Sequence, residues 1–173
     1  MSMKVERLKE YRVAFRGLKE GIHAFHFVLD DCFFDCFEAT QGMKGAVDAH
    51  VEVVKYTLLM ELRIKIEGEV RATCDRCLDE VTLPVSGEMS LYLKEGEREA
   101  GNEDDFIVLS PEEDYLDLGT PLYELYMLSY PIRVVHPEGE CNPEMERVLK
   151  EFVLDENKTI DPRWDELRKL INN

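Results

Sequence analysis

Two cysteines separated by two residues, Cys74 and Cys77, have the type and spacing in this chain that most readily support chemistry. A pair of thiolates at this spacing can supply two ligands to a metal ion, and a tetrahedral zinc site needs two more. His136 and Cys141 lie downstream at a suitable spacing. The candidate metal ligands are therefore Cys74, Cys77, Cys141 and His136, although Leu78 occupies the position after Cys77 where zinc-binding turns usually have glycine.

Two other interpretations of the cysteine pair stay open. The thiols can simply pack in a turn, and the long separation between Cys77 and His136 favours this interpretation over zinc. A thiol oxidoreductase would place the motif at a helix N-terminus, where the dipole stabilises the thiolate. Apolar residues alternate after Cys77, which predicts a strand instead. Zinc is therefore a candidate cofactor and no other cofactor is expected.

No pattern in the sequence supports catalysis. His23 and His26 fall on opposite faces of a predicted strand, and His50 stands alone by the same alternation. The chain has no phosphate-binding glycine loop, no serine nucleophile motif and no His-Glu-x-x-His. We expect a protein that is not an enzyme and has no catalytic residues.

The charge of the chain restricts its partners. Asp and Glu number 37 against 21 Lys and Arg, giving a net charge of -16 over 173 residues. Such a balance argues against binding to duplex DNA or to an anionic membrane surface, which both use clustered bases. Ten acids and one base lie between Glu95 and Asp117, so an acidic connection is predicted over residues 94–117. Direct contact with RNA stays open.

The compartment is predicted from what the sequence lacks. No run approaches 18 consecutive apolar residues, and the first ten residues contain no apolar signal core. The five cysteines are an odd number, which indicates reduced thiols and not a disulfide framework. We expect a cytoplasmic protein.

A long central hairpin must position the cysteine pair. Apolar residues occupy even positions from Leu58 to Cys74 and odd positions from Cys77 to Leu93. The phase changes across Asp75-Arg76, which predicts a hairpin with these two residues as its turn. That register joins apolar residues on one face and opposite charges on the other. The pairs are Val70 with Val81, Ile66 with Val85, Arg71 with Glu80 and Arg63 with Glu88.

The remaining elements indicate an α+β fold. Strands are predicted at 11–15 and 23–29, joined by a turn, and at 47–53, with a short strand at 106–109. Cys32 to Phe37 fits one helical turn or a packed loop. Thr120-Pro121, Asn142-Pro143 and Asp161-Pro162 each resemble a helix start. We expect a twisted antiparallel β-sheet that could close toward a barrel, with C-terminal helices, in one domain over 1–155 and a tail over 156–173.

The segment from Gly68 to Leu78 resembles the Gly-x-Val…Cys-x-Arg-Cys-Leu signature of the bacterial YceD-like family, which is named for large ribosomal RNA subunit accumulation. Further similarity lies at Asp117-Leu118, at 123–131 and at 161–170. The resemblance implies a cytoplasmic, non-enzymatic factor that supports accumulation or processing of large-subunit ribosomal RNA. A ribosomal protein or a large-subunit precursor particle is the implied partner.

Arg76 and Leu78, at the tip of the predicted hairpin, are the candidate partner-binding residues, together with the acidic connection. A basic ribosomal protein would be attracted to such acidic residues. The alternative function is a zinc-stabilised protein-binding module unrelated to ribosomes.

Overall fold

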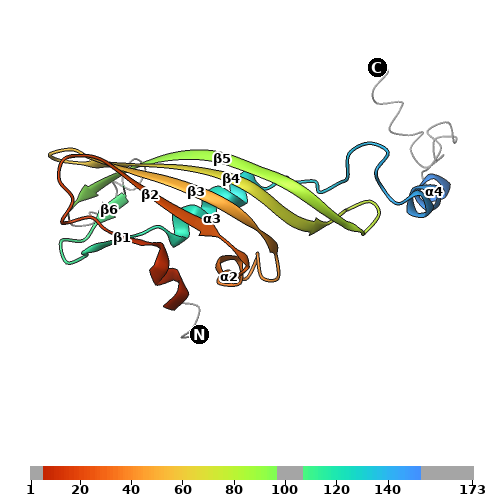
Figure 1. Ribbon diagram of the computed structural model, residues 1–173, viewed down its shortest axis with the longest axis horizontal. Coiled ribbons are helices and arrows are strands. Elements are labelled where there is room, and N and C mark those ends of the chain that lie inside the picture. Colours follow the sequence, from red (N-terminus) through yellow and green to blue (C-terminus); the bar gives the residue numbers. More distant parts are fainter. Residues whose placement is uncertain (1–5, 97–106, 153–173) are drawn as a thin grey trace, which may run out of the picture.

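A five-stranded sheet is the framework of the molecule in the computed structural model, which describes residues 6–96 and 107–152 (Figure 1). The strand order is β2-β3-β4-β5-β6. The strands are β2 Gly21–Leu29, β3 Lys44–Lys55, β4 Met60–Thr73, β5 Glu80–Glu95 and β6 Ile107–Leu109. Strands β2 to β5 pair antiparallel and β6 joins β5 in parallel. The sheet is open, with β2 and β6 at its edges, so the fold is α+β as predicted but not a closed barrel.

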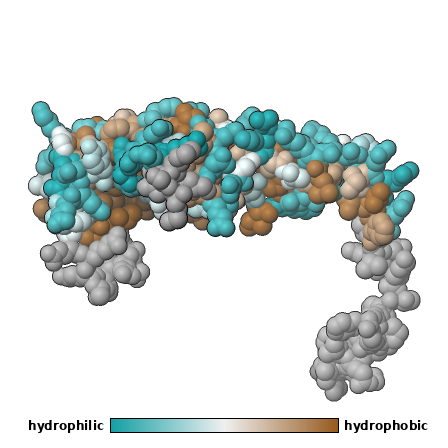
Figure 2. All heavy atoms as spheres, turned by 90° about the horizontal axis from the view of Figure 1, so that it is seen from below, coloured by the Kyte–Doolittle hydropathy of each residue, from teal (hydrophilic) through white to brown (hydrophobic). Residues whose placement is uncertain are grey.

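One face of this sheet carries the core. Alternate residues of β3, from Val47 to Val53, are fully buried, and those of β4 and β5 continue the apolar layer. Helix α3, Gly119–Ser129, packs on this layer through Leu122, Leu125 and Tyr126. The opposite face carries mostly charged and polar side chains, as the period-2 pattern requires. Hydrophilic side chains interspersed with hydrophobic patches are visible along one side of the molecule in Figure 2.

The central hairpin exists, but its predicted register is wrong by two residues. Val70 lies opposite Leu83, and Val81 lies opposite Ala72. The strands are joined by the six residues 74–79, not by a two-residue turn at Asp75-Arg76. A shift of two keeps every side chain on its predicted face, so the apolar pattern could not detect the error. The predicted charge pairs change: Arg71 lies opposite Thr82, Arg63 opposite Ser90, and Lys65 opposite Glu88.

A second, two-stranded sheet was not predicted. Strand β1, Arg12–Ala14, pairs with β7, Tyr115–Asp117, and not with β2. The preceding 3-10 helix, Lys9–Tyr11, adds the buried ring of Tyr11, which contacts Phe33 of α2, Asp31–Phe34. The two N-terminal strands are therefore present as predicted, but they belong to different sheets.

The helices start close to their predicted positions. Helix α3 begins at Gly119, so Thr120 lies inside it and is not the N-cap. Burial of Leu118 and its backbone bond to Tyr11 fix the chain there and start the helix earlier. Helix α4, Pro143–Phe152, begins as predicted, because the Asn142 side chain accepts from the Glu144 N–H at 3.0 Å. The predicted helix at 162–170, the tail at 156–173 and residues 97–106 of the acidic connection lie outside the described residues.

Candidate metal centre

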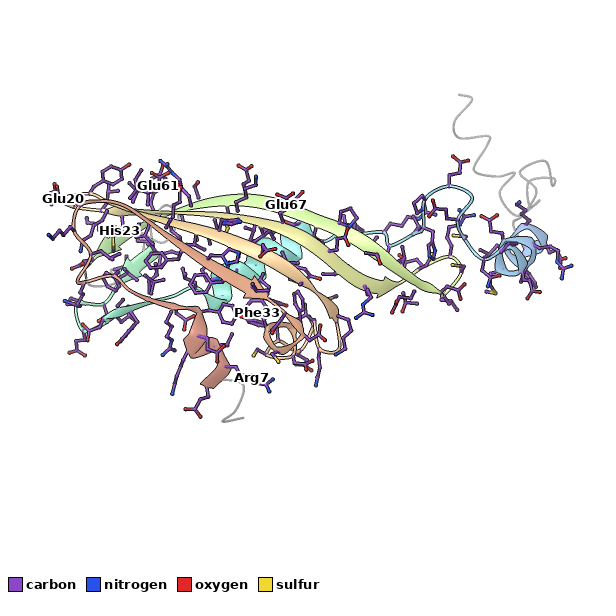
Figure 3. All side chains as sticks on the ribbon, in the orientation of Figure 1. Arg7, Glu20, His23, Phe33, Glu61 and Glu67 are labelled. Atoms are coloured by element: carbon purple, nitrogen blue, oxygen red, sulfur yellow. The ribbon has the colours of Figure 1, made fainter. Side chains whose placement is uncertain are left out.

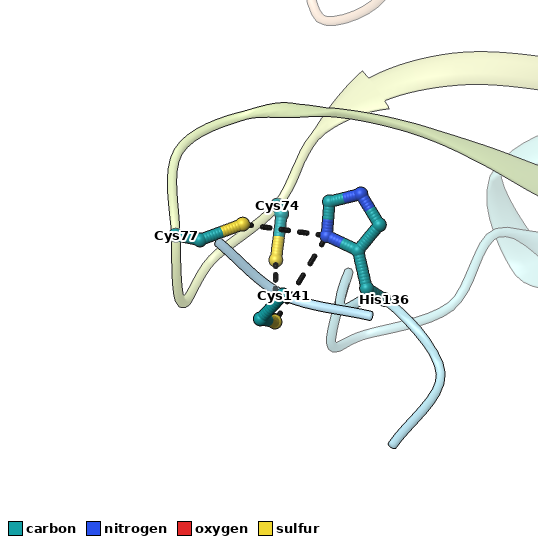
Figure 4. A group of neighbouring side chains, drawn as sticks. All are labelled: Cys74, Cys77, His136 and Cys141. Carbon is teal, nitrogen blue, oxygen red and sulfur yellow. Dashed lines mark hydrogen bonds between the residues drawn. The ribbon is translucent and has the colours of Figure 1, made fainter. Parts of the chain in front are cut away.

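Four side chains from distant parts of the chain meet beyond the end of the central hairpin (Figure 4). The ligating atoms of Cys74, Cys77, His136 and Cys141 all lie within 4.8 Å of one another. The Sγ atoms of Cys74 and Cys141 are 3.9 Å apart, and His136 Nδ1 lies 3.3 Å from Cys77 Sγ. All three cysteines are buried. The structure thus brings together the whole predicted ligand set.

The segment that follows β4 forms the first half of the site. The Cys74 N–H donates to the Asp79 carbonyl at 2.8 Å, and the Leu78 N–H donates to the Cys74 carbonyl at 2.9 Å. The Arg76 N–H points at Cys74 Sγ, 3.4 Å away. Leu78 has φ 64°, the left-handed conformation that glycine adopts most readily. Leucine therefore takes the backbone geometry that glycine provides in other zinc-binding turns.

The segment between α3 and α4 forms the second half. Asp75 fastens it to the hairpin tip twice: its N–H donates to the Val134 carbonyl and its carboxylate accepts from the Val134 N–H, both at 2.7 Å. His136 Nε2 lies 3.1 Å from the Glu80 carbonyl oxygen. Because a carbonyl oxygen only accepts, Nε2 carries the hydrogen of the neutral imidazole, and in that form the Nδ1 lone pair is directed toward the thiols and can bind a metal.

The electrostatics of the cluster favour ionisation of Cys74 but not of Cys141. Burial alone would raise the pKa of Cys74, but hydrogen bonds from the backbone at Cys77 and Arg76 and the interaction with His136 outweigh it, so the pKa is lowered to about 5. The hydrogen bond with Cys74 raises the pKa of His136. Burial and the neighbouring thiols raise the pKa of Cys141 to about 11. Without a metal, a thiolate at Cys74 therefore lies beside a protonated thiol at Cys141.

The donor set fits zinc. Thiolate sulfur lies about 2.3 Å from zinc, which places two sulfurs of a tetrahedral site roughly 3.8 Å apart. The Cys74–Cys141 separation of 3.9 Å matches this value. Three cysteines and one histidine make a closed four-ligand set of the structural kind, with no position left for a substrate. Cys74 follows a strand and not the start of a helix, so the feature that activates thioredoxin-type thiols is not found there.

The two candidate partner-binding residues differ in availability. The Leu78 side chain is 67% exposed. Arg76 instead binds within the chain, because its guanidinium lies 3.2 Å from the Glu146 carboxylate on α4. The acidic connection begins at the far end of β5, so its described start and the hairpin tip lie at opposite ends of that strand. Two described acids in the connection already pair with bases, Asp114 with Arg16 and Asp117 with Arg12.

The sequence did not predict which residues support the ligands. Asp75 was interpreted as a turn residue, and no spacing signal connects it to Val134. The ion pair of Arg76 with Glu146 likewise joins residues that are distant in the sequence, so no local pattern indicates it. A second constellation was also missed: His26 and His50 face each other on β2 and β3 with ring centroids 4.9 Å apart, and His26 lies 2.9 Å from Asp48. The sheet register alone creates this exposed group.

Fold and site together define an α+β protein whose long hairpin ends in a closed three-cysteine, one-histidine cluster. Among the described residues, no helix is long and apolar enough to span a bilayer. The chain belongs to the family described as large ribosomal RNA subunit accumulation protein YceD, whose sequence model matches residues 62–171. No curated protein and no solved structure gives a significant match. The matched region contains all four cluster residues.

Proposed function

We propose that this protein is a non-enzymatic accessory factor in ribosome large-subunit biogenesis, which supports accumulation or processing of large-subunit ribosomal RNA through protein or ribonucleoprotein contacts. The family match over residues 62–171 carries this proposal. The closed ligand set supports the non-enzymatic part, because it leaves no coordination position for a reaction.

Zinc at the cluster would have a structural role. The ligands come from the hairpin tip and from the segment before α4, so one bound ion would fasten these two parts of the chain together. Structural zinc contributes its binding free energy to folding. In this proposal the ion fixes the geometry of the tip, where the exposed side chain of Leu78 is the main contact for a partner.

The partner proposed for the tip is a ribosomal protein or a large-subunit precursor particle. A net charge of -16 favours a basic protein over an RNA backbone, because like charges repel. The described strands of the central hairpin mix acids and bases on their exposed face and offer no basic track for RNA.

Capture of the tagged protein from its own cells, with and without ribonuclease, tests the proposed function. Large-subunit precursor RNA or ribosomal proteins are expected, and loss after ribonuclease would identify an RNA contact. The variant with Arg76→Ala and Leu78→Ala should lose the partner while staying folded. Leu58→Ala is the matched control, because Leu58 is 84% exposed in the turn at the opposite end of β4. Unchanged capture by the double variant would remove the tip from the proposal.

The alternative is a zinc-stabilised protein-binding module unrelated to ribosomes. The geometry of the cluster supports this function as well as it supports the ribosomal one. A preparation that holds stoichiometric zinc but captures no ribosomal component would move this function to first place.

A further inference from the structure

Strand β2 is an edge strand, and its outward backbone groups can be identified. At the turn between β3 and β4, the Tyr56 N–H donates to the Leu59 carbonyl at 2.9 Å. Antiparallel bonding alternates from that pair, so even-numbered β3 residues bond to β4 and odd-numbered ones bond to β2. The register then directs the backbone groups of the even-numbered β2 residues away from the sheet. The Tyr11 hydroxyl confirms this direction, because it donates to the Val28 carbonyl from outside at 2.8 Å.

Among the residues that the structure describes, the rest of this edge has no hydrogen-bond partner. Across residues 6–96 and 107–152, no hydrogen bond reaches the outward N–H and C=O groups of Ile22, Ala24 and His26. Proteins usually protect such an edge with Lys, Pro or another charged residue. Gly21–Leu29 contains no charged residue and no proline. The strand therefore has the features of an edge that accepts another strand.

The core face of β2 is also incomplete. Phe25 and Phe27 pack against the core but stay only partly buried, although the Tyr11 ring lies beside that of Phe27 with centroids 5.8 Å apart. On the other face the Ile22 side chain is 65% exposed. A strand added along Ile22 to His26 would bond the open groups and cover both phenylalanine rings with its own apolar side chains.

The charges beside β2 indicate what this strand should carry. Glu52 lies on β3 directly opposite Ala24, whose small side chain leaves it accessible from the edge, and the Arg63 guanidinium lies 4.0 Å from its carboxylate on the β4 side. Glu20 precedes the strand, and Figure 3 shows it at the start of β2. The two lysines at the ends of β3 are occupied, Lys44 by Asp31 and Lys55 by the Phe15 carbonyl. The whole chain adds a net charge of -16.

We propose that the edge of β2 from Ile22 to His26 binds an extended basic peptide segment by strand addition, with apolar and basic residues alternating along the bound segment. The apolar side chains lie beside Phe25 and Phe27, and the basic ones lie on the exposed face and reach past Ala24 toward Glu52. This surface is distinct from the hairpin tip, so the proposal does not depend on zinc or on a ribosomal role.

Fluorescence anisotropy with a labelled peptide of alternating valine and lysine, as long as the nine residues of β2, tests this proposal. The full chain at physiological ionic strength should bind it. N-methylation of alternate peptide residues on the bonding edge should weaken binding by about tenfold or more, because several backbone hydrogen bonds are lost. The protein is unchanged in that comparison, so folding does not affect it.

Variants of the edge provide the second comparison. Ala24→Pro removes an outward N–H at a position where an edge strand tolerates proline, and should abolish binding. Ala24→Ser keeps the N–H and should bind as the original protein does. Glu52→Gln should weaken binding of the lysine peptide but not of a valine-threonine peptide.

Three results would overturn the proposal. They are equal binding of the N-methylated peptide, equal binding of a peptide with the same composition but with valines and lysines in separate blocks, and a dimer in sedimentation that Ala24→Pro dissociates. The first two would indicate general attraction of bases to an acidic protein. The third would show that a second copy of the chain occupies the edge.

Discussion

Leu78 combines two features that a leucine at a turn would normally avoid. Its backbone is left-handed, with φ 64°, and its side chain is 67% exposed. A non-glycine residue in this conformation costs roughly 1–2 kcal/mol. The exposed apolar side chain in this conformation is the reason for testing Leu78 as a contact in the proposed function.

We expect Leu78→Gly to keep the fold and any bound zinc while losing partner capture. Relief of the left-handed strain is partly offset by the greater backbone freedom of glycine in the unfolded chain, so the free energy of unfolding should rise by about 0–1 kcal/mol. Thermal denaturation and capture measure the two effects. Leu78→Ala is the matched control, because it removes the side chain but keeps the strain. Normal capture by both variants would show that Leu78 is not a contact.

Cys141 is the ligand with the clearest expected response to zinc. Its pKa is raised to about 11, so it is protonated near neutral pH without metal and must release a proton on binding. The apparent zinc affinity should therefore rise with pH between about 6 and 8. Cys141→Ser should lower that affinity by more than the roughly 10–100-fold caused by outer-shell changes. Cys32→Ser, at an exposed thiol outside the cluster, should leave it unchanged, and a loss there would implicate a different site.

At the level of elements, the close approach of the β3 backbone explains why the segment that resembles the family begins with a glycine, Gly68. A Cβ at this position would lie 2.6 Å from Val47 Cα and closer still to the Ala46 carbonyl oxygen. The backbone of β3 therefore lies too close to Gly68 of β4 for any other side chain. Because both obstacles are backbone atoms, neither can rotate away.

Gly68→Ala should lower the free energy of unfolding by about 1–3 kcal/mol or more, as overpacking does. Chemical denaturation measures the change. Gly17→Ala is the control, because a Cβ there meets nothing within 4 Å and the substitution should be close to neutral. Equal stability of the two variants would contradict this close approach of β3 to Gly68.

The sequence predicted elements better than it predicted pairings. Alternation assigned the faces of β4 and β5 correctly, since face depends only on parity. Alternation did not predict the register, because the loop at 74–79 is closed by a backbone hydrogen bond between Cys74 and Asp79. This bond does not depend on the alternation of apolar residues. Strands β1 and β7 are about a hundred residues apart in the chain, so their pairing has no local signal. The four ligands were found because cysteine and histidine are identifiable by chemistry alone.

At the scale of the whole molecule, the family match and the architecture divide the chain differently. The match begins at residue 62, inside β4, so β1, β2 and β3 lie outside it. Those strands nevertheless supply the fully buried Val47 to Val53 layer and the open edge of β2. In the described part of the chain, the hairpin tip and the β2 edge are therefore separate surfaces joined by one sheet.

The same separation predicts what removal of zinc does. None of the four cluster ligands comes from β2, β3 or α3. Apart from the cluster, the tip is joined to the segment after α3 by the two Asp75–Val134 hydrogen bonds of 2.7 Å and by three further polar contacts, His136 with Glu80, Asn142 with Asp79 and Arg76 with Glu146. Such bonds contribute about 1 kcal/mol each, far less than the roughly 10–16 kcal/mol of structural zinc. A chelator should therefore release the segment from Val134 through α4 while the sheet stays folded.

Hydrogen exchange should show loss of protection in α4 and unchanged protection in β3 and β4, and Cys141→Ser should give the same result without chelator. Loss of protection across the whole sheet would show that the metal holds the entire fold, and no change at all would show that the cluster holds the tip as packed thiols.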